Sequence, residues 1–358
     1  MRNNLLENLQ CRLLQGPGAI ALLGQELDAE SKVLLISTPN MCRRSCWSSL
    51  TETLGTRAFS TITVDSNPEI DDVDCLLEKM RLQRIDFIVA LGGGSVLDVA
   101  KVLSVMLHHA NNSLTLDEVL RNGTAFVSSR ISLVCVPTTS GTGAEVTPFA
   151  TIWDRKNMKK RSFAATTLIP DTVILDPELT FGTPIGLTVN FALDTCSHAM
   201  ETLWNRNATS QSIEYANNAL DLFVKNFPLV LKADSILVRE NLQIASFIAG
   251  MAIAISRTAI AHSMSYPITL HYGVPHGLSC SFSLPKIAEM VTQKDAWVNG
   301  ADKELIRQVI AILEGLDLDL KINSYCSREQ RFALVGEMMT KGRADNFVLS
   351  DFSVLDLL

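Results

Sequence analysis

The chain has 358 residues, 47% of them hydrophobic and 19% charged, so it is long enough to bury the cores of two globular domains. A net charge of −7 and a pI near 5.4 argue against a nucleic-acid partner, because no basic stripe is present to neutralise phosphates. The N-terminus lacks the apolar core of a signal peptide, and no stretch approaches the ~20 apolar residues of a membrane-spanning helix. Eight scattered cysteines without a CxxC favour reduced thiols, so we expect a cytoplasmic protein.

The first half of the chain alternates short apolar runs with helical patterns. The runs have the length of buried strands, and the stretches between them repeat apolar residues at helical spacing. The predicted strands are Val33–Ser37, Thr61–Val64, Phe87–Leu91, Leu133–Val136 and Val173–Leu175, and the clearest helices between them are Asp71–Arg84 and Ser95–His108. This order predicts a mostly parallel sheet with helices on both faces.

Two loops in this half have the composition of phosphate-binding turns. Gly92, Gly93 and Gly94 follow a predicted strand directly, and helical spacing begins at Ser95. Glycines allow a tight turn in which the amides at the helix start face a pyrophosphate, although a plain structural turn is an equal alternative for this loop taken alone. The segment Pro137-Thr-Thr-Ser-Gly-Thr-Gly143 again leads from a strand into hydroxyl and glycine residues, which favours the phosphate-binding interpretation.

The second half has long helical periodicities and almost no alternating pattern. The predicted helices include Ser210–Phe227, Ser235–Ile255 and Lys303–Leu316. The break falls near Asp176–Pro184, which predicts an α/β domain over residues 1–180 and an all-helical domain over 181–358. A ligand cleft is expected between two such domains.

Four potential metal ligands lie in the helical half. Asp194 and His198 stand four apart in a helical stretch, so they share one face and can bind one ion together. His262 and His276 lie fourteen residues apart, a spacing that suits one ligand on a second helix and another in the loop after it. Three imidazoles and a carboxylate suit Fe²⁺, Zn²⁺ or Mn²⁺ better than Ca²⁺ or Mg²⁺, and the ligand type does not separate the first three. A single histidine on an apolar helix is more often a hydrogen-bonded core residue.

These motifs, in this order, resemble the iron-containing alcohol dehydrogenases over about residues 18–285. The resemblance implies a Rossmann-like dinucleotide-binding domain followed by a helical metal-binding domain, the architecture also found in dehydroquinate synthase. It implies hydride transfer between NAD(P)H and a small aldehyde or alcohol, and a homodimer or larger homo-oligomer. By position, the metal ligands are Asp194, His198, His262 and His276, and the cofactor contacts are Gly93, Gly94, Ser95, Asp98, Thr138, Thr139, Thr142 and Lys160.

The proton donor and the cofactor preference stay open at this stage. Many relatives have a histidine four residues after the third metal ligand, where this chain has Tyr266. The candidate proton donors are Tyr266, His271 and solvent. An equal alternative for Tyr266 is a packed aromatic residue that shapes the pocket. After the first strand, Thr38 replaces the acidic residue of many NADH-preferring members, and Arg43 and Arg44 follow. NADPH is slightly favoured over NADH, with a solvated helix face as the alternative role for the arginine pair.

The segment from Ser256 to Gly277 is most similar, within that family, to the phosphonoacetaldehyde reductases of phosphonate biosynthesis, which make 2-hydroxyethylphosphonate. Arg257 is the best candidate to bind the phosphonate, and a surface role is its alternative. The favoured substrate is therefore phosphonoacetaldehyde. The alternatives are a general short-chain alcohol dehydrogenase for uncharged substrates and, in a different class, a lyase similar to dehydroquinate synthase.

Overall fold

The computed structural model describes residues 9–43, 45–55, 57 and 59–358. The chain divides into two compact units, each described here by itself. The first unit runs to Phe181, and the second begins at Gly182. One short segment departs from this order, because residues 140–143 belong to the second unit although the chain on both sides of them belongs to the first.

The first unit is built on a parallel sheet of six strands in the order β1-β8-β5-β4-β2-β3. The strands are β1 (Arg12–Gln15), β2 (Val33–Ser37), β3 (Phe59–Thr63), β4 (Phe87–Gly92), β5 (Ser132–Pro137) and β8 (Thr172–Leu175). The chain leaves β2 for β3 on one side and then crosses to β4 on the other. The carboxyl ends of β2 and β4 therefore flank the point where the strand order reverses, and doubly wound sheets bind nucleotides at such a point.

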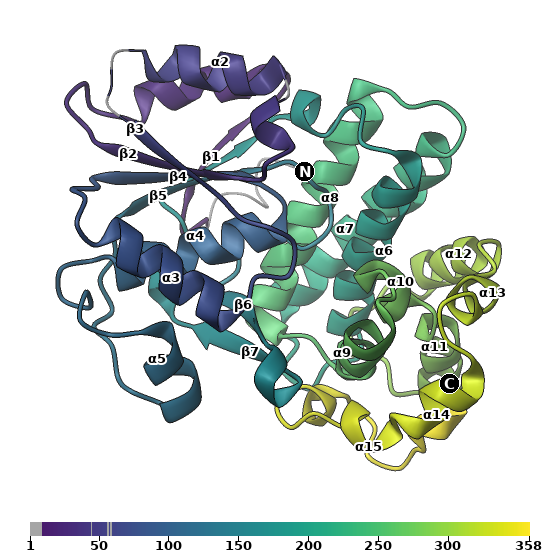
Figure 1. The fold of residues 1–358 in the computed structure, drawn as a ribbon. Coiled ribbons are helices and arrows are strands. Elements are labelled where there is room, and N and C mark those ends of the chain that lie inside the picture. The colour runs from purple at the N-terminus through teal and green to yellow at the C-terminus, as the bar shows by residue number, and fades with distance from the viewer. Residues whose placement is uncertain (1–8, 44, 56, 58) are drawn as a thin grey trace. The chain divides into compact units, whose positions relative to one another are not determined.

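Helices cover both faces of this sheet, as predicted (Figure 1). They are α2 (Ser45–Leu54), α3 (Ile70–Met80), α4 (Gly94–Met106) and α5 (Leu116–Asn122), with short 3₁₀ helices at Ala19–Gln25, Met41–Arg43, Arg155–Asn157, Thr166–Leu168 and Pro177–Leu179. Alternate residues of β2 enter separate cores: Leu34 and Ile36 pack with α3 and α4, whereas Val33 and Leu35 pack with α2. All five residues of β2 are buried, which is the pattern of a strand covered on both sides.

The sequence patterns missed three strands of the first unit. One is the edge strand β1, and the other two form the antiparallel hairpin of β6 (Phe149–Asp154) and β7 (Lys159–Ala164). The residues Asp154 to Lys160 between and within these strands are mostly polar, so they give little apolar alternation to detect. The hairpin carries Lys160, one of the predicted cofactor contacts.

The second unit is helical, as predicted (Figure 1). Its helices are α6 (Ile185–Thr202), α7 (Ser210–Val230), α8 (Ile236–Ser256), α9 (Ile260–Tyr272), α10 (His276–Ser281), α11 (Leu284–Gln293), α12 (Lys303–Glu314), α13 (Leu318–Asn323), α14 (Arg328–Ala333) and α15 (Val335–Met338), followed by 3₁₀ turns at Ala344–Asn346 and Val354–Leu357. The last residues pack within the chain: Phe347, Leu357 and Leu358 are buried, and Phe347 contacts Trp204 edge to face at 6.5 Å.

One expectation about membranes needs correction. Helix α8 is 21 residues long and apolar enough to cross a membrane by length and composition, contrary to the expectation that no stretch approaches this limit. Of its most apolar window, 78% is buried inside the protein, and α8 packs along α6 and α7. Its apolar surface is therefore that of a core helix.

Candidate active site

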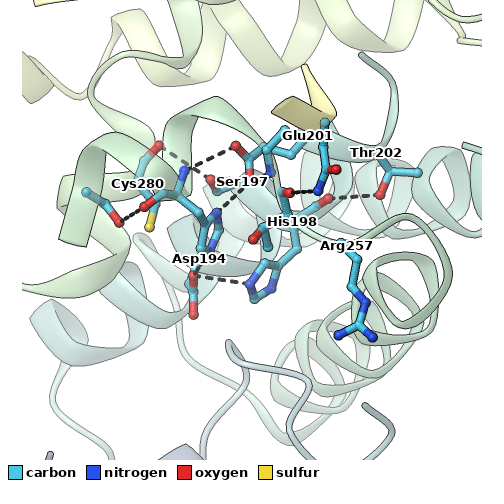
Figure 2. Close-up of polar contacts among 12 residues, drawn as sticks. Asp194, Ser197, His198, Glu201, Thr202, Arg257 and Cys280 are labelled. Carbon is cyan, nitrogen blue, oxygen red and sulfur yellow. Dashed lines mark hydrogen bonds and ion pairs between the residues drawn. The ribbon is translucent and has the colours of Figure 1, made fainter. Parts of the chain in front are cut away.

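Asp194 and His198 lie one helical turn apart on α6, in a stretch of that helix that is buried throughout. The Nε2 atom of His198 is 3.6 Å from Asp194 Oδ1, and Figure 2 shows the two side chains extending from the helix toward each other. Asp194 is 4% exposed and His198 is 5% exposed. The predicted four-residue spacing thus forms a buried pair of ligand atoms.

Two further imidazoles reach the same carboxylate oxygen. His262, in the first turn of α9, has its Nε2 3.5 Å from Asp194 Oδ1, and His276, the first residue of α10, has its Nε2 3.8 Å away. The rings of His262 and His276 meet edge to face at 5.4 Å, and those of His198 and His262 stack at 4.7 Å. The structure therefore brings all four predicted metal ligands together.

A glycine fixes the position of His276. An added Cβ at Gly277 would lie 1.8 Å from the carbonyl oxygen of Asn190, so only glycine lets the start of α10 approach α6 this closely. The Oδ1 atom of Asn190 accepts a hydrogen bond from the Leu278 amide at 3.0 Å. These contacts join the element that carries His276 to the element that carries Asp194.

The donor set fits a divalent metal ion. Ligands held about 2.1 Å from a tetrahedral ion lie about 3.4 Å from one another, close to the separations around Asp194 Oδ1. Asp194 Oδ1 and His262 Nε2 are buried without a hydrogen-bond partner among the described residues. Burying such atoms costs free energy unless something binds them, and a metal ion would bind both.

The pKa shifts of the clustered side chains are also compatible with a bound cation. Burial lowers the pKa of His198 to about 4, so its imidazole is neutral and able to coordinate a metal at neutral pH. Burial opposes ionisation of Asp194, but the three histidines lower its pKa overall. Burial also opposes a charge on His262, yet Cys280, Glu201 and Asp194 raise its pKa well above the usual value. The same surroundings would favour a divalent cation in place of that proton, since an imidazole must be deprotonated to coordinate a metal.

Glu201 is a functional residue that the sequence patterns did not single out. Its carboxylate is fully buried, lies 2.6 Å from His262 Nδ1, and accepts hydrogen bonds from the amides of His262 and Ala259 at 3.1 and 3.0 Å. Carboxylates in this position fix the orientation of metal-binding imidazoles. The available signal was its place seven residues after Asp194, on the same face of α6.

Cys280 was also missed. Its sulfur belongs to a group with Asp194, His262 and His276 in which all ligand atoms lie within 4.8 Å of one another, and it is 3.6 Å from the ring nitrogens of His276. Cys280 follows His276 by four residues, so one turn of α10 brings both to the cluster. Cys196, in contrast, is buried in α6 as packing, and the cysteines whose side chains are described are free thiols.

The two candidate proton donors lie differently on α9. Tyr266 follows His262 by one turn, and its ring stacks on His276 with a centroid distance of 5.9 Å and an interplanar angle of 13°. His271 is nine residues from His262, which turns it to the opposite side of the helix, and its Nε2 is 3.1 Å from Glu337. The geometry favours Tyr266 over His271 for a role at the cluster.

Arg257 occupies a strained position between α8 and α9. Its φ of 66° and ψ of 172° fall in a region that is essentially restricted to glycine, at a cost on the order of 1–3 kcal/mol. Asn205 Nδ2 and Ser256 Oγ donate to its carbonyl oxygen at 3.0 and 3.1 Å and hold this conformation. Strain of this kind is concentrated at functional sites, and Arg257 is drawn with the cluster in Figure 2.

The glycine loop of the first unit joins β4 to the N-terminus of α4, as predicted. Gly93 is the N-cap residue, and Gly94 and Ser95 form the first turn of the helix. An added Cβ at Gly92 would lie 2.6 Å from Val96, and one at Gly93 would lie 3.1 Å from Thr139, so the backbone is tightly packed here. The first backbone amides of this helix lie at the carboxyl edge of the sheet, where helix starts can bind anions.

Thr38, Thr138 and Thr139 lie at the same edge of the sheet. Thr38 follows β2, and its Oγ1 accepts a hydrogen bond from the Met41 amide at 3.2 Å. Thr138 and Thr139 follow β5, and the Thr138 amide donates to Gly92 at 3.0 Å. Thr142 belongs to the short segment of the second unit. Arg43 is exposed, and Arg44 lies outside the described residues.

Asp98 and Lys160 are brought together by the β6–β7 hairpin. Asp98, on α4, accepts a hydrogen bond from the Thr151 amide of β6 at 2.9 Å. Lys160, on β7, places its Nζ 4.5 Å from the centre of the Trp153 ring. Burial raises the pKa of Asp98 to about 6, although Lys101, the Thr151 amide and Lys160 act to lower it.

Comparison with known proteins identifies the family. The iron-containing alcohol dehydrogenase model matches residues 11–177, and the model for the C-terminal domain of the same family matches residues 188–341. The chain belongs to the iron-containing alcohol dehydrogenase family. It is therefore a metal-dependent oxidoreductase of alcohols and aldehydes that uses a nicotinamide cofactor.

Individual relatives in this family differ in substrate. The chain is 31% identical to phosphonoacetaldehyde reductase of Streptomyces viridochromogenes over 75% of its own length and 69% of the relative's. It is 30% identical to the probable alcohol dehydrogenase EutG of Escherichia coli, over 77% and 70%. The fold matches the structure of sulfoacetaldehyde reductase from Bifidobacterium kashiwanohense in complex with NAD⁺, with a TM-score of 0.86 and 24% identity over 98% of this chain and 96% of that one.

Proposed function

We propose that the protein reduces phosphonoacetaldehyde to 2-hydroxyethylphosphonate with a hydride from NAD(P)H. The observation that carries the reaction class is the convergence of three imidazole nitrogens on Asp194 Oδ1. The finer choice of substrate is supported by the 31% identity to a phosphonoacetaldehyde reductase and by Arg257 beside the metal-ligand elements. A homodimer or larger homo-oligomer is part of the same proposal.

Asp194, His198, His262 and His276 would hold a divalent ion, which would supply Lewis acidity at the carbonyl oxygen, and a nicotinamide cofactor would supply the hydride. The reaction balances when the aldehyde gains this hydride at carbon and a proton at oxygen, giving the alcohol and NAD(P)⁺.

The protein side chains orient the metal ligands, balance the charge of the ion and provide the proton. Asp194 contributes the negative charge of the donor set, and Glu201 keeps His262 directed at the cluster. Tyr266, stacked on His276, is the proposed proton donor through its Oη.

The proposed cofactor site lies at the carboxyl edge of the sheet. The amides of Gly93, Gly94 and Ser95 bind the pyrophosphate, assisted by the hydroxyls of Thr138, Thr139 and Thr142. Thr38 lies after the strand where an acidic side chain would repel a 2′-phosphate, which keeps NADPH admissible beside NADH. Asp98 and Lys160 complete the proposed contacts from α4 and β7.

A second candidate is a general short-chain alcohol dehydrogenase, which the similarity to EutG favours. The metal-loaded enzyme should be assayed with phosphonoacetaldehyde and with propanal, a neutral aldehyde of similar size. A much higher kcat/KM for phosphonoacetaldehyde is expected, and equal values would defeat the phosphonate proposal. Stoichiometric consumption of NAD(P)H is expected as well, whereas a lyase would consume none.

A further inference from the structure

A second arginine lies near the metal-ligand cluster. The guanidinium carbon of Arg343 lies 4.7 Å from the centre of the Tyr266 ring, and that ring stacks on His276. One aromatic ring thus connects the guanidinium to a metal ligand. Arg343 directly precedes the 3₁₀ turn Ala344–Asn346, which packs against α9.

The turn that follows Arg343 is hydrogen-bonded to the residue after Arg257, because Asn346 Nδ2 donates to the Thr258 carbonyl oxygen at 2.8 Å. Partial burial lowers the pKa of Arg257, and the charge of Arg343 lowers it further. Two like charges near each other repel, and this repulsion is relieved when an anion binds between them. The backbone of Arg257 meanwhile keeps a conformation that is essentially restricted to glycine, which fixes where its side chain starts.

We propose that Arg257 and Arg343 form an anion-binding pair for the terminal phosphonate or sulfonate of a two-carbon aldehyde, with Arg343 as the specificity-determining residue. The inference rests on the proposed function and deepens it, because it assigns a residue to the recognition of the group remote from the reacting carbon. Phosphonate and sulfonate share a tetrahedral set of oxygens, which the planar guanidinium fork of arginine binds through two parallel hydrogen bonds.

The size of such a substrate limits how far the anion-binding group can lie from the reacting carbon. One carbon–carbon bond and one carbon–phosphorus or carbon–sulfur bond separate the carbonyl carbon from the phosphorus or sulfur atom, a span on the order of 3 Å. The group that binds the anionic end must therefore lie near the imidazole cluster, and Tyr266, whose ring stacks on His276, also contacts the Arg343 guanidinium. Stacking on Tyr266 orders the guanidinium before the anion arrives, so less side-chain entropy is lost on binding.

The test removes the Arg343 charge and keeps a matched control. Arg328 also stacks on an aromatic ring, at 5.1 Å from Phe332, but on α14 and outside the cluster. Arg343→Met and Arg328→Met should be compared with the wild type in the zinc-loaded enzyme. Calorimetric titration with 2-hydroxyethylphosphonate, with 2-hydroxyethylsulfonate and with 1-propanol measures binding without turnover, and kcat/KM is measured for phosphonoacetaldehyde, sulfoacetaldehyde and propanal.

The expected result is a selective loss. In Arg343→Met, the Kd of the anionic alcohols and the KM of their aldehydes should rise at least tenfold, with values for 1-propanol and propanal within twofold of the wild type. Arg328→Met should change none of them. Arg343→Lys, which keeps the charge and loses the fork, should recover part of the affinity; it also serves if Arg343→Met does not fold. The wild-type kcat/KM values for phosphonoacetaldehyde and sulfoacetaldehyde show whether phosphonate or sulfonate is preferred.

Two outcomes would overturn the inference. One is an equal loss for charged and neutral compounds, which would make Arg343 a support for Tyr266 alone. The other is binding of the anionic alcohols that is unchanged in both Arg343 variants. Failure of the proposed function is distinguishable: if the wild type binds both anions through Arg343 but does not reduce phosphonoacetaldehyde, the anion-binding pair stands and the proposed substrate is wrong.

Discussion

The first unit buries Lys101 and the second buries Asp194, and both side chains carry their charge away from water. Lys101 uses its Nζ to donate to Thr147 O, Thr147 Oγ1 and Phe149 O at 2.9, 3.0 and 3.0 Å, so its hydrogen-bonding capacity is met inside the protein. Asp194 Oδ1 and His262 Nε2 have no such partner among the described residues. The first cluster is complete as a structural element, whereas the second requires a cation to complete it.

The strongest way to test this contrast is to remove a metal ligand. Asp194→Ala should abolish metal binding and reduce kcat/KM by a factor of about 10³ or more, because the electrophile is lost with the ion. Metal content by elemental analysis, far-ultraviolet circular dichroism and steady-state kinetics are the measurements. Extraction of the ion from the wild type with a chelator should reproduce the loss, and added Fe²⁺ or Zn²⁺ should restore activity only in the wild type. Full activity in the chelated protein would contradict the metal assignment.

Removing Lys101 should lower the stability of the fold and leave metal binding unchanged. Lys101→Met removes the donor to Thr147 O, Thr147 Oγ1 and Phe149 O and one of the cations near Asp98, so the unfolding free energy should fall by about 3–5 kcal/mol. Urea denaturation measures this loss. Metal content per folded protein should stay at the wild-type value, and a loss of metal would show that the two clusters are not independent.

Glu145 provides a pH test of the first unit. Burial raises its pKa from 4.5 to about 7, so the folded protein binds a proton there more tightly than the unfolded chain does. The corresponding stabilisation is complete below pH 4.5 and is lost as the pH rises through 7, with a total on the order of 3 kcal/mol. Relative to Glu145→Gln, the wild type should therefore lose unfolding free energy between pH 4.5 and 7. Parallel pH profiles for the two proteins would contradict the prediction.

The smallest expected effect concerns the orientation of a ligand. Burial alone would raise the pKa of Glu201, but His262 and two backbone amides lower it overall, so the residue acts as a carboxylate. The Ala259 and His262 amides donate to different oxygens of Glu201, so Glu201→Gln keeps an acceptor for only one of them and removes the charge beside His262. Metal affinity should fall about 10- to 100-fold with the fold preserved, as measured by competition with a chromophoric chelator. Glu337→Gln, which alters the partner of His271 at the exposed side of α9, is the control and should leave metal affinity unchanged.

Local patterns predicted most of the architecture. The strand β2 was predicted with its observed bounds, and β4, β5, α7 and α8 within a few residues, because each has a strong apolar periodicity. The edge strand β1 and the β6–β7 hairpin were missed, since their pairing is made by distant partners rather than by alternation within the strand. Lys160 was nonetheless named through family resemblance, without knowledge of the strand that carries it.

The amino-acid sequence by itself determined the ligand pairs whose geometry is local. Asp194 and His198 share a face because the helix repeats every 3.6 residues, and the start of α4 presents amides because glycines precede it. The tertiary structure alone decided which elements meet. It places the Glu201 carboxylate against Nδ1 of His262, the Cys280 sulfur near Asp194, His262 and His276, and the Arg343 guanidinium on the Tyr266 ring. These contacts join residues far apart in the chain, and only the packing of α6, α9 and α10 fixes the distances between them.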